Sequence, residues 1–268
     1  LVPGEKYWFC KNKKGFLPSV LENLITLRAE IKKKIKSLLI RDHLLEARSE
    51  SLKLLANSFY GYMGFAPARW YSMESARSIT ALGRHYIHRV IDMAQKAEFK
   101  VLYSDTDSIF LCLGGKTESD ALALVDGINK TLPGIMELDY EGFYPVALFV
   151  SAKAGPYGAK KKYALLDRKG KLKIRGFETV RRNWSIIAKE VQEHVLDIVL
   201  REKDTAKALL YVKQIIESLR KHTLGVDKVI ISTQLQRPIE AYESVGPHVA
   251  VAQRMKNRGI DVGPGTIV

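Results

Sequence analysis

The sequence contains few cysteines and no long run of apolar residues. Its two cysteines, Cys10 and Cys112, stand alone, so neither belongs to a close-spaced set that binds a metal. No apolar stretch reaches the length of a membrane span, and no charged start followed by an apolar stretch resembles a signal peptide. Internal repeats and low-complexity tracts are also lacking. We therefore expect an intracellular protein with reduced cysteines and no membrane span.

Positive charge is what the sequence has in excess. Its 268 residues include 43 lysines and arginines against 29 aspartates and glutamates, which gives a formal net charge of +14. This excess predicts a polyanionic partner, with nucleic acid as the first candidate and an anionic membrane surface as the second. The length suffices for one large domain or two ordinary ones. The chain begins with Leu1, so we expect a processed or cut chain or part of a longer gene product.

The spacing of the apolar residues predicts an α+β protein. Helical spacing occurs over 18–41, 43–60, 72–99, 119–132, 184–201, 204–220 and 248–257. Strand-like patterns cover 99–103, 108–113, 136–150, 160–167 and 171–177, and the last two form an expected hairpin across the turn DRKG. The pattern after residue 176 is mainly helical, so we expect a boundary near that position.

Two aspartates, Asp105 and Asp107, lie one residue apart in VLYSDTDSIF, at the turn of an expected hairpin. Two carboxylates ~4 Å apart repel by about 4 kcal/mol at a surface-like dielectric constant, which favours a bound cation. A few hard oxygen ligands with open water positions suit Mg²⁺ shared with a substrate phosphate. Asp-Thr-Asp is also common in solvated turns, which is the alternative. An EF-hand is excluded, because its glycine and distant glutamate do not follow at the required spacing.

Further acids follow in MELDYEGFY, where Asp139 and Glu141 alternate with a leucine and a tyrosine. On a strand both carboxylates would lie on one face. They either join Asp105 and Asp107 around a metal or line a solvated face of the sheet.

Cations and polar groups fall on one face of each of the first two expected helices. In KLLANSFYG, Lys53, Asn57 and Tyr60 lie at i, i+4 and i+7, where they can contact a phosphate and a base or sugar. The buried side of that helix would be formed by Leu54, Leu55 and Phe59. Arg28 and Lys32 lie at i and i+4 on the first helix and would meet Lys53 if the helices pack antiparallel. Three converging cations can hold a triphosphate, whereas a solvated polar face is the alternative in each case.

Together these motifs resemble family B DNA polymerases, most closely the archaeal branch. KLLANSFYG, followed about forty residues later by YSDTDS, is similar to the second and third motifs of that family. The resemblance extends along nearly the whole chain through KGFLPSVL, FYGYMGFAPARWY, DYEGFY, KKKYAL, RGFETVRRNWS and GPHVAVAQR. It implies a portion of a right-hand polymerase fold. The implied parts are a palm stub (1–14), helical-pair fingers (15–64), an antiparallel-sheet palm with packed helices (65–175) and a mainly helical, shortened thumb (176–268).

The resemblance also implies roles for single residues. Asp107 matches the required metal-binding aspartate of the third motif and Asp105 lies beside it, while Glu141 and, less closely, Asp139 match acids of a further metal position. Five residues match positions that bind the incoming nucleotide in the family: Arg28, Lys32, Lys53, Asn57 and Tyr60. The resemblance also implies a catalytic role for Lys53. Contacts to primer–template DNA are matched by Lys161, Lys162, Tyr163, Arg181, Arg182 and His248. The loop 151–159 is longer than in similar sequences, and no role is implied for it.

The family's first motif, an aspartate-bearing strand followed by SLYPS, does not occur in this sequence, nor does an exonuclease domain. Two-metal transfer needs the bridging carboxylate of that motif. We therefore expect a second polypeptide to supply both, as in the split family B polymerases of some archaea. A fragment of one long chain fits the sequence equally well.

The resemblance implies a DNA-directed DNA polymerase, in the cytoplasm at the nucleoid, that adds dNTPs to a primer 3′-hydroxyl with two Mg²⁺ ions. The implied partners are primer–template DNA, dNTPs, the larger polymerase polypeptide and a sliding clamp. The alternative is a non-catalytic DNA-binding or assembly subunit derived from a polymerase. A membrane-surface protein would explain the net charge and nothing else.

Overall fold

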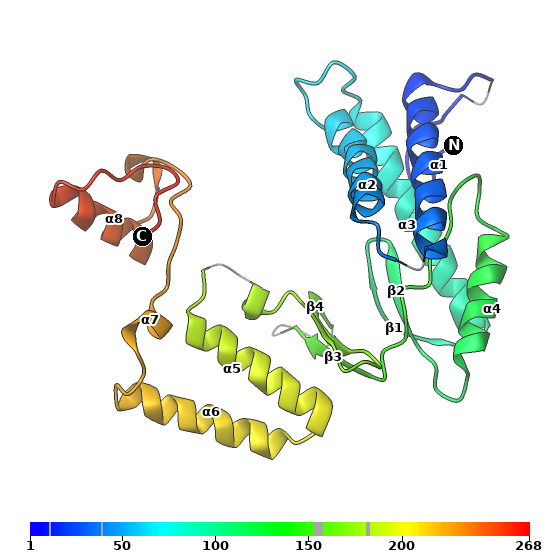
Figure 1. Ribbon diagram of the computed structural model, residues 1–268. Helices are drawn as coiled ribbons and strands as arrows, with labels where there is room; N and C mark the ends of the chain where they lie inside the picture. Colours follow the sequence, from blue (N-terminus) through cyan, green and yellow to red (C-terminus); the bar gives the residue numbers. More distant parts are fainter. Residues whose placement is uncertain (11, 39, 153–157, 181–182) are drawn as a thin grey trace. The chain divides into compact units, whose positions relative to one another are not determined.

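The computed structural model describes residues 1–10, 12–38, 40–152, 158–180 and 183–268 (Figure 1). The chain forms two compact units, Leu1–Glu141 and Gly142–Val268. Both combine helices with a small antiparallel sheet, so the predicted α+β class is confirmed. The borders predicted for fingers, palm and thumb remain predictions. No helix within the described residues is long and apolar enough to cross a membrane.

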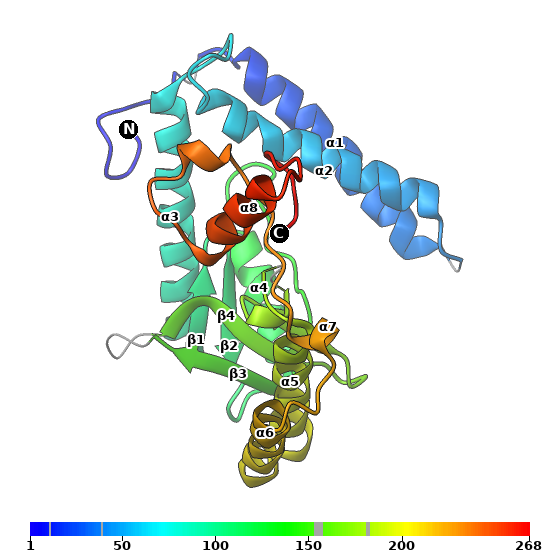
Figure 2. The same cartoon turned by 90° about the vertical axis from the view of Figure 1, so that its left-hand side faces the viewer.

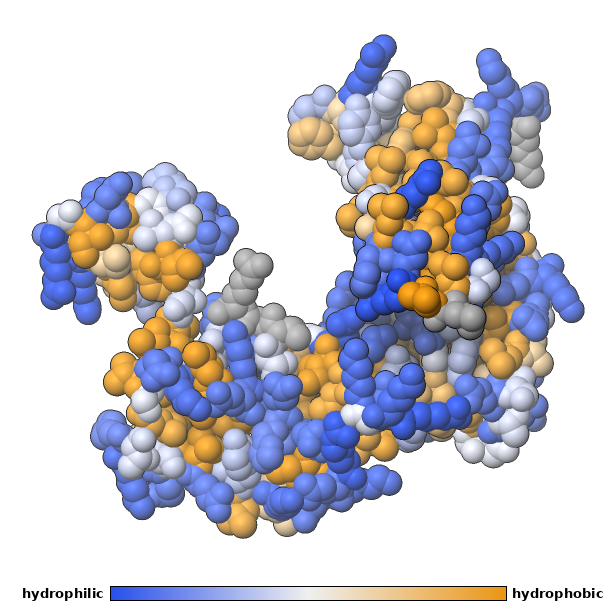
Figure 3. All heavy atoms as spheres, viewed as in Figure 1, coloured by the Kyte–Doolittle hydropathy of each residue, from blue (hydrophilic) through white to orange (hydrophobic). Residues whose placement is uncertain are grey.

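The first unit begins with a pair of long helices, α1 (Phe16–Ser37) and α2 (His43–Met63). Figure 2 shows them side by side along much of their length. The Asp42 side chain starts α2 by accepting hydrogen bonds from the backbone N–H groups of Leu44 and Leu45. The prediction that Leu54 and Leu55 are buried is wrong, because these side chains are 63% and 50% exposed. Apolar side chains gather over this helix pair in Figure 3 as orange patches among blue ones.

The core of this unit joins two helices to a β-hairpin. Helix α3 (Met73–Lys96) is capped by Ser72 and leads into the antiparallel strands β1 (Lys100–Asp105) and β2 (Ser108–Cys112). Helix α4 (Glu118–Asn129) follows and begins with a capping box. Ala94, Phe99 and Ala121 form a buried cluster at the centre, and the inward side chains of both strands pack against it. These contacts anchor the hairpin to α3 and α4, with its turn at one end.

The prediction of a strand over 136–150 is only half right. Strand β3 covers Val146–Ser151, whereas residues 135–145 contain no strand. Both amide atoms of Asn129 bind the backbone of Leu138, with 2.7 Å from the Leu138 nitrogen to Oδ1 and 3.1 Å from Nδ2 to the Leu138 oxygen. These hydrogen bonds satisfy backbone groups that a strand would otherwise pair. The expected single face for Asp139 and Glu141 is therefore not formed.

The second unit is built on a three-stranded sheet in the order β3-β4-β5, with β4 at Gly158–Leu166 and β5 at Leu172–Arg175. A 3₁₀ turn, η1 (Glu178–Val180), precedes α5 (Ile186–Asp197), which continues into the π-helical turn η2 (Ile198–Glu202). Helix α6 (Thr205–Arg220) follows the cap residue Asp204, whose side chain accepts a hydrogen bond from the Lys207 N–H. Ala164, Phe177, Leu196 and Leu200 form the buried cluster between the sheet and the helix made by α5 and η2. The predicted hairpin across DRKG is confirmed by the antiparallel pairing of β4 with β5.

The C-terminal segment has a small core of its own. It contains α7 (Val226–Val229), the 3₁₀ turn η3 (Ile239–Ala241) and α8 (Pro247–Asn257). Buried Leu235, Ile239, Val249 and Ala252 pack together. Helix α8 ends as predicted just before Gly259, whose positive φ of 80° lets the chain turn away.

Candidate functional site

The turn between β1 and β2 carries two carboxylates on a short loop. Strand β1 ends at Asp105, which pairs with Ser108, so only Thr106 and Asp107 form the turn. Thr106 has a positive φ of 57°, and the Asp107 N–H donates to the Asp105 carbonyl over 2.7 Å. The Thr106 hydroxyl donates to Asp105 Oδ1 over 3.0 Å. Both aspartates are thereby fixed at one end of the hairpin, as predicted.

These two carboxylates suit part of a magnesium site. Asp107 is exposed, and its side chain has no hydrogen bond or ion pair within the described residues. Its oxygens are hard ligands beside a neighbour of the same charge, a donor set that Mg²⁺ prefers. Among the described residues, however, no three acid, histidine or cysteine side chains gather closely enough to hold a metal. The predicted grouping of these aspartates with Asp139 and Glu141 is therefore not formed in this structure.

Asp139 lies instead against the cationic face of α1. Lys32 Nζ donates to Asp139 Oδ2 over 2.6 Å. This hydrogen bond lowers the pKa of the Asp139 carboxyl below its usual value, helped by the charges of Lys32, Lys36 and Arg28 and opposed by partial burial. Arg28, Lys32 and Lys36 follow one another at four-residue steps and so share one helix face. Arg28 Nε is buried without a hydrogen-bond partner in the described part of the chain.

The polar stripe predicted from KLLANSFYG lies on α2. Lys53 pairs with Glu50 on its own helix, 3.0 Å from Nζ to Oε1. The predicted convergence of Lys53 with Arg28 and Lys32 stays a prediction. Asn57 and Tyr60 are exposed on this helix, as a surface that contacts a ligand requires.

In the second unit, a side-chain network surrounds Lys162 on β4. Lys162 Nζ lies 2.9 Å from Glu178 Oε1 and 5.0 Å from the centre of the Phe177 ring. Gln192 on α5 donates to Glu178 Oε2 over 2.5 Å and accepts from the Thr179 N–H over 3.0 Å. Neither Glu178 nor Gln192 was predicted from the sequence. The predicted hairpin across DRKG held a signal for Glu178. In an antiparallel hairpin that pairs Tyr163 with Arg175, the residues that follow Arg175 lie beside the lysines that precede Tyr163.

The Glu178 carboxylate predicts a loss of stability in acid. The hydrogen bond from Gln192 and then that from Lys162 lower its pKa from 4.5 to about 2. A carboxyl whose pKa is lower in the folded state stabilises the fold fully above its unfolded pKa, and this contribution disappears as the pH falls towards the folded pKa. We expect the wild-type free energy of unfolding to lose about 2 kcal/mol from this group between pH 5 and pH 3.

Urea unfolding at several pH values measures this loss. The Glu178→Gln variant should be less stable than wild type at pH 5, and the difference should shrink by about 2 kcal/mol at pH 3. Glu243→Gln is the control, because Glu243 is exposed and has no side-chain partner among the described residues. A constant difference between wild type and Glu178→Gln over this range would contradict the assignment.

The other residues predicted to contact DNA differ in their surroundings. The exposed Lys161 has a positive φ of 58°. The Tyr163 ring lies 5.9 Å from that of Phe149, and the half-buried His248 ring lies edge-on to Tyr242 at 5.5 Å. Arg181 and Arg182 lie outside the described residues.

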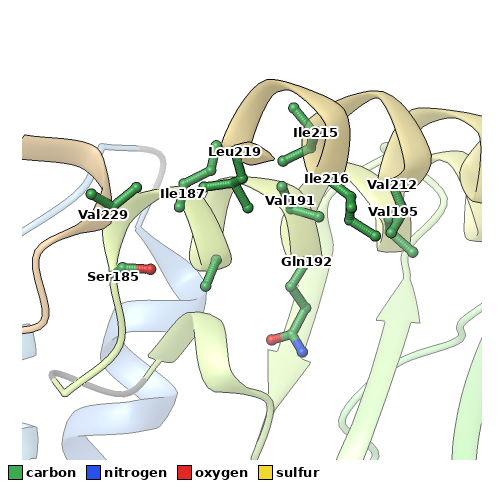
Figure 4. Close-up of a pocket in the computed structure, with 11 residues that line it drawn as sticks. Ser185, Ile187, Val191, Gln192, Val195, Val212, Ile215, Ile216, Leu219 and Val229 are labelled. Atoms are coloured by element: carbon green, nitrogen blue, oxygen red, sulfur yellow. The ribbon is translucent and has the colours of Figure 1, made fainter. Parts of the chain in front are cut away.

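An apolar hollow between α5 and α6 has a volume of about 570 Å³ (Figure 4). Its walls are mostly valine, isoleucine and leucine side chains, among them Val191, Val195 and Ile216. Because an apolar wall cannot satisfy the oxygens of a phosphate, this hollow is not a candidate nucleotide site.

Comparison with known proteins places these features in one family. A family model described as DNA polymerase family B matches residues 3–264. The chain is 44% identical over 275 residues to DNA polymerases of Pyrococcus glycovorans and of Thermococcus gorgonarius, which covers 100% of this chain and 34% of each relative. The solved structure of the family B DNA polymerase from the archaeon Pyrobaculum calidifontis is 34% identical, with a TM-score of 0.68, and the match covers 97% of this chain and 33% of that one.

The chain thus spans about a third of the length of the relatives it matches. The fold predicted from the motifs, a portion of the family's polymerase architecture, agrees with the Pyrobaculum calidifontis structure. The chain belongs to DNA polymerase family B.

Proposed function

We propose that this chain carries the fingers, palm and thumb portions of a DNA-directed DNA polymerase, with the borders predicted above. The observation that carries the proposal is the β1–β2 turn, which holds Asp105 and Asp107 at the end of a packed hairpin, in a chain that belongs to family B. The cationic face of α1 lies in the same unit and supplies the complementary charge for a triphosphate.

In the proposed reaction, the 3′-hydroxyl oxygen of the primer attacks the α-phosphorus of a bound dNTP. A bond forms between these two atoms, the bond from the α-phosphorus to the bridging oxygen breaks, and pyrophosphate leaves. Asp107 and Asp105 would hold Mg²⁺, which when bound neutralises charge on the reacting phosphate and lowers the pKa of the hydroxyl. Arg28, Lys32 and Lys53 would neutralise the triphosphate, and Asn57 and Tyr60 would contact its sugar or base.

A third carboxylate from outside these 268 residues would complete the metal site. Two-metal transfer uses a carboxylate that bridges both ions, and no group of three acids placed for a metal occurs among the described residues. We infer that this carboxylate lies, with an exonuclease domain, on another polypeptide or on another part of the same chain. DNA, dNTPs and a sliding clamp are the remaining proposed partners.

Primer extension tests this proposal. The chain alone and the chain combined with the rest of a family B polymerase are incubated with primer–template DNA, Mg²⁺ and dNTPs. Extension in the combined sample alone is the expected result. DNA binding without extension in either sample would favour the alternative, a non-catalytic DNA-binding subunit.

The lysines of β4 should differ in their contribution to DNA binding. Lys161 is exposed, whereas Lys162 is half-buried and lies against Glu178 and the Phe177 ring. Lys161→Ala should weaken binding to any duplex sequence and reduce the slope of log K against log salt concentration by about 0.9, the value for one lost phosphate contact. Lys162→Ala should change this slope less and lower the stability instead. Fluorescence anisotropy titrations at several salt concentrations measure both slopes, and equal slopes for the two variants would contradict the distinction.

A further inference from the structure

One side chain that the resemblance assigns to a metal site is bound to a cation of α1. Lys32 and Asp139 are 107 residues apart in sequence, yet Nζ lies 2.6 Å from Oδ2. The Lys32 side chain is 36% exposed and that of Asp139 is 58% exposed, so solvent and solutes can reach the pair. An ion pair this accessible contributes little to stability and can be displaced by a competing anion.

Asp139 does not reach Lys32 by chance, because helix α4 holds both of its neighbours. Asn129 is the last residue of α4. Its side-chain Nδ2 donates to the Leu138 carbonyl, and its Oδ1 accepts from the Leu138 N–H. Glu118, the first residue of α4, accepts a hydrogen bond from the Tyr140 hydroxyl over 2.6 Å. The segment between these anchors is therefore fixed along the helix. This arrangement presents the Asp139 carboxylate to α1 at a set position.

The charges on α1 exceed what Asp139 can neutralise. Arg28, Lys32 and Lys36 all act on its carboxyl, which carries one negative charge. A nucleoside triphosphate carries three to four negative charges and several acceptor oxygens, so it matches this face better than one carboxylate does. Arg28 Nε, which has no partner among the described residues, could then gain one.

We propose that Asp139 occupies the place of a nucleotide phosphate on Lys32, so that an incoming nucleoside triphosphate must displace it. Asp139 is then a positioning residue, which holds Lys32 ready in the nucleotide-free state and competes with weakly bound anions. This inference rests on the proposed function, since it assigns the same triphosphate to α1. It departs from the resemblance, under which Asp139 would be a metal ligand.

Calorimetric titration of the 268-residue chain with dATP and Mg²⁺ tests the proposal. Asp139→Asn removes the competitor and should tighten dATP binding by up to about fivefold, since an exposed pair is worth at most about 1 kcal/mol. Lys32→Met should weaken binding. In the Lys32→Met background, Asp139→Asn should bring no gain, because the two residues act on one interaction.

Two further measurements separate displacement from a general effect of removing negative charge. Glu137→Gln removes the same charge two residues away, from an exposed side chain without a partner among the described residues, and should change binding less than twofold. In primer extension with the completed polymerase, Asp139→Asn should lower the KM for dATP and leave kcat unchanged. A lower kcat, or an equal gain in the Lys32→Met background, would overturn the proposal.

The outcomes also distinguish this inference from the proposed function. If wild type extends the primer, but Asp139→Asn and Glu137→Gln have the same dATP affinity and the same KM, this inference alone is overturned. Absence of both dATP binding and extension in wild type overturns both.

Discussion

Asp107→Asn is expected to abolish nucleotide incorporation by the completed polymerase while leaving DNA binding intact. The substitution keeps the size and planar shape of the side chain, but it replaces an acceptor oxygen by a donor NH₂ group and removes the negative charge that would hold the metal. Loss of a metal ligand from a two-metal site removes both the activation of the 3′-hydroxyl and the neutralisation of the phosphate. The rate of single-nucleotide incorporation should therefore fall by about a thousandfold or more.

Binding of Mg²⁺ to the chain itself provides a second readout that does not require activity. A ligand that binds only the folded state stabilises it by about 1.4 kcal/mol at ten times its Kd. Mg²⁺ should raise the Tm of wild type, and this increase should disappear in Asp107→Asn. Without Mg²⁺ the variant should be at least as stable as wild type, because one of two neighbouring like charges has been removed.

Asp126→Asn is the matched control for this prediction. Asp126 is exposed on α4, in the same unit, and its side chain has no partner among the described residues. It should keep the wild-type rate and the wild-type response to Mg²⁺. Incorporation at the wild-type rate by Asp107→Asn would contradict the assigned role. If wild type is inactive, and if Asp107→Asn changes neither DNA binding nor the effect of Mg²⁺ on the Tm, the non-catalytic alternative is supported.

Local sequence signals predicted the elements of this fold well. Helix periodicity identified α2 and α6. Both helices begin after an aspartate, Asp42 or Asp204, whose side chain accepts from backbone N–H groups, as is typical of this residue type. The two-residue turn between β1 and β2 followed from two short apolar runs around Ser-Asp-Thr-Asp. The position of Asp105 and Asp107 at the end of a hairpin was therefore predictable from a stretch of ten residues.

Contacts between distant residues were not predictable in the same way. The alternation around Asp139 is typical of a strand, but the two hydrogen bonds between Asn129 and Leu138 give that segment another conformation. The exposure of Leu54 on α2 has a related cause, because helical periodicity shows which side chains share a face but not which partner covers that face. Ion pairs such as Lys32–Asp139 depend on the packing of several elements, and no local pattern encodes them.

Gly176→Ala is expected to be among the most destabilising single substitutions in the second unit. Gly176 follows β5 with a positive φ of 67°, and a Cβ added there would lie 1.8 Å from the Lys161 carbonyl oxygen. Real Cβ atoms do not approach an oxygen so closely, and the obstacle is backbone rather than a flexible side chain. Strain and the forced separation of β4 from β5 together should cost about 4 kcal/mol or more. The Tm should fall by about 10 °C or more, or the variant should fail to fold.

Gly170→Ala is the control that distinguishes the backbone clash at Gly176 from the strain that any alanine has at a positive φ. Gly170 lies in the turn of the same hairpin with a φ of 76°, but its added Cβ would meet only the end of the flexible Arg201 side chain. Gly170→Ala should therefore cost about 1–2 kcal/mol, and an equal loss of stability in both variants would contradict the clash at Gly176.

The close approach of Gly176 to the Lys161 carbonyl also bears on DNA binding, because Gly176 lies beside Lys161 and only two residues before Glu178, the partner of Lys162. If Gly176→Ala folds at low temperature, its DNA affinity should fall further than that of Gly170→Ala, since the displaced β4 backbone carries both lysines away from their positions.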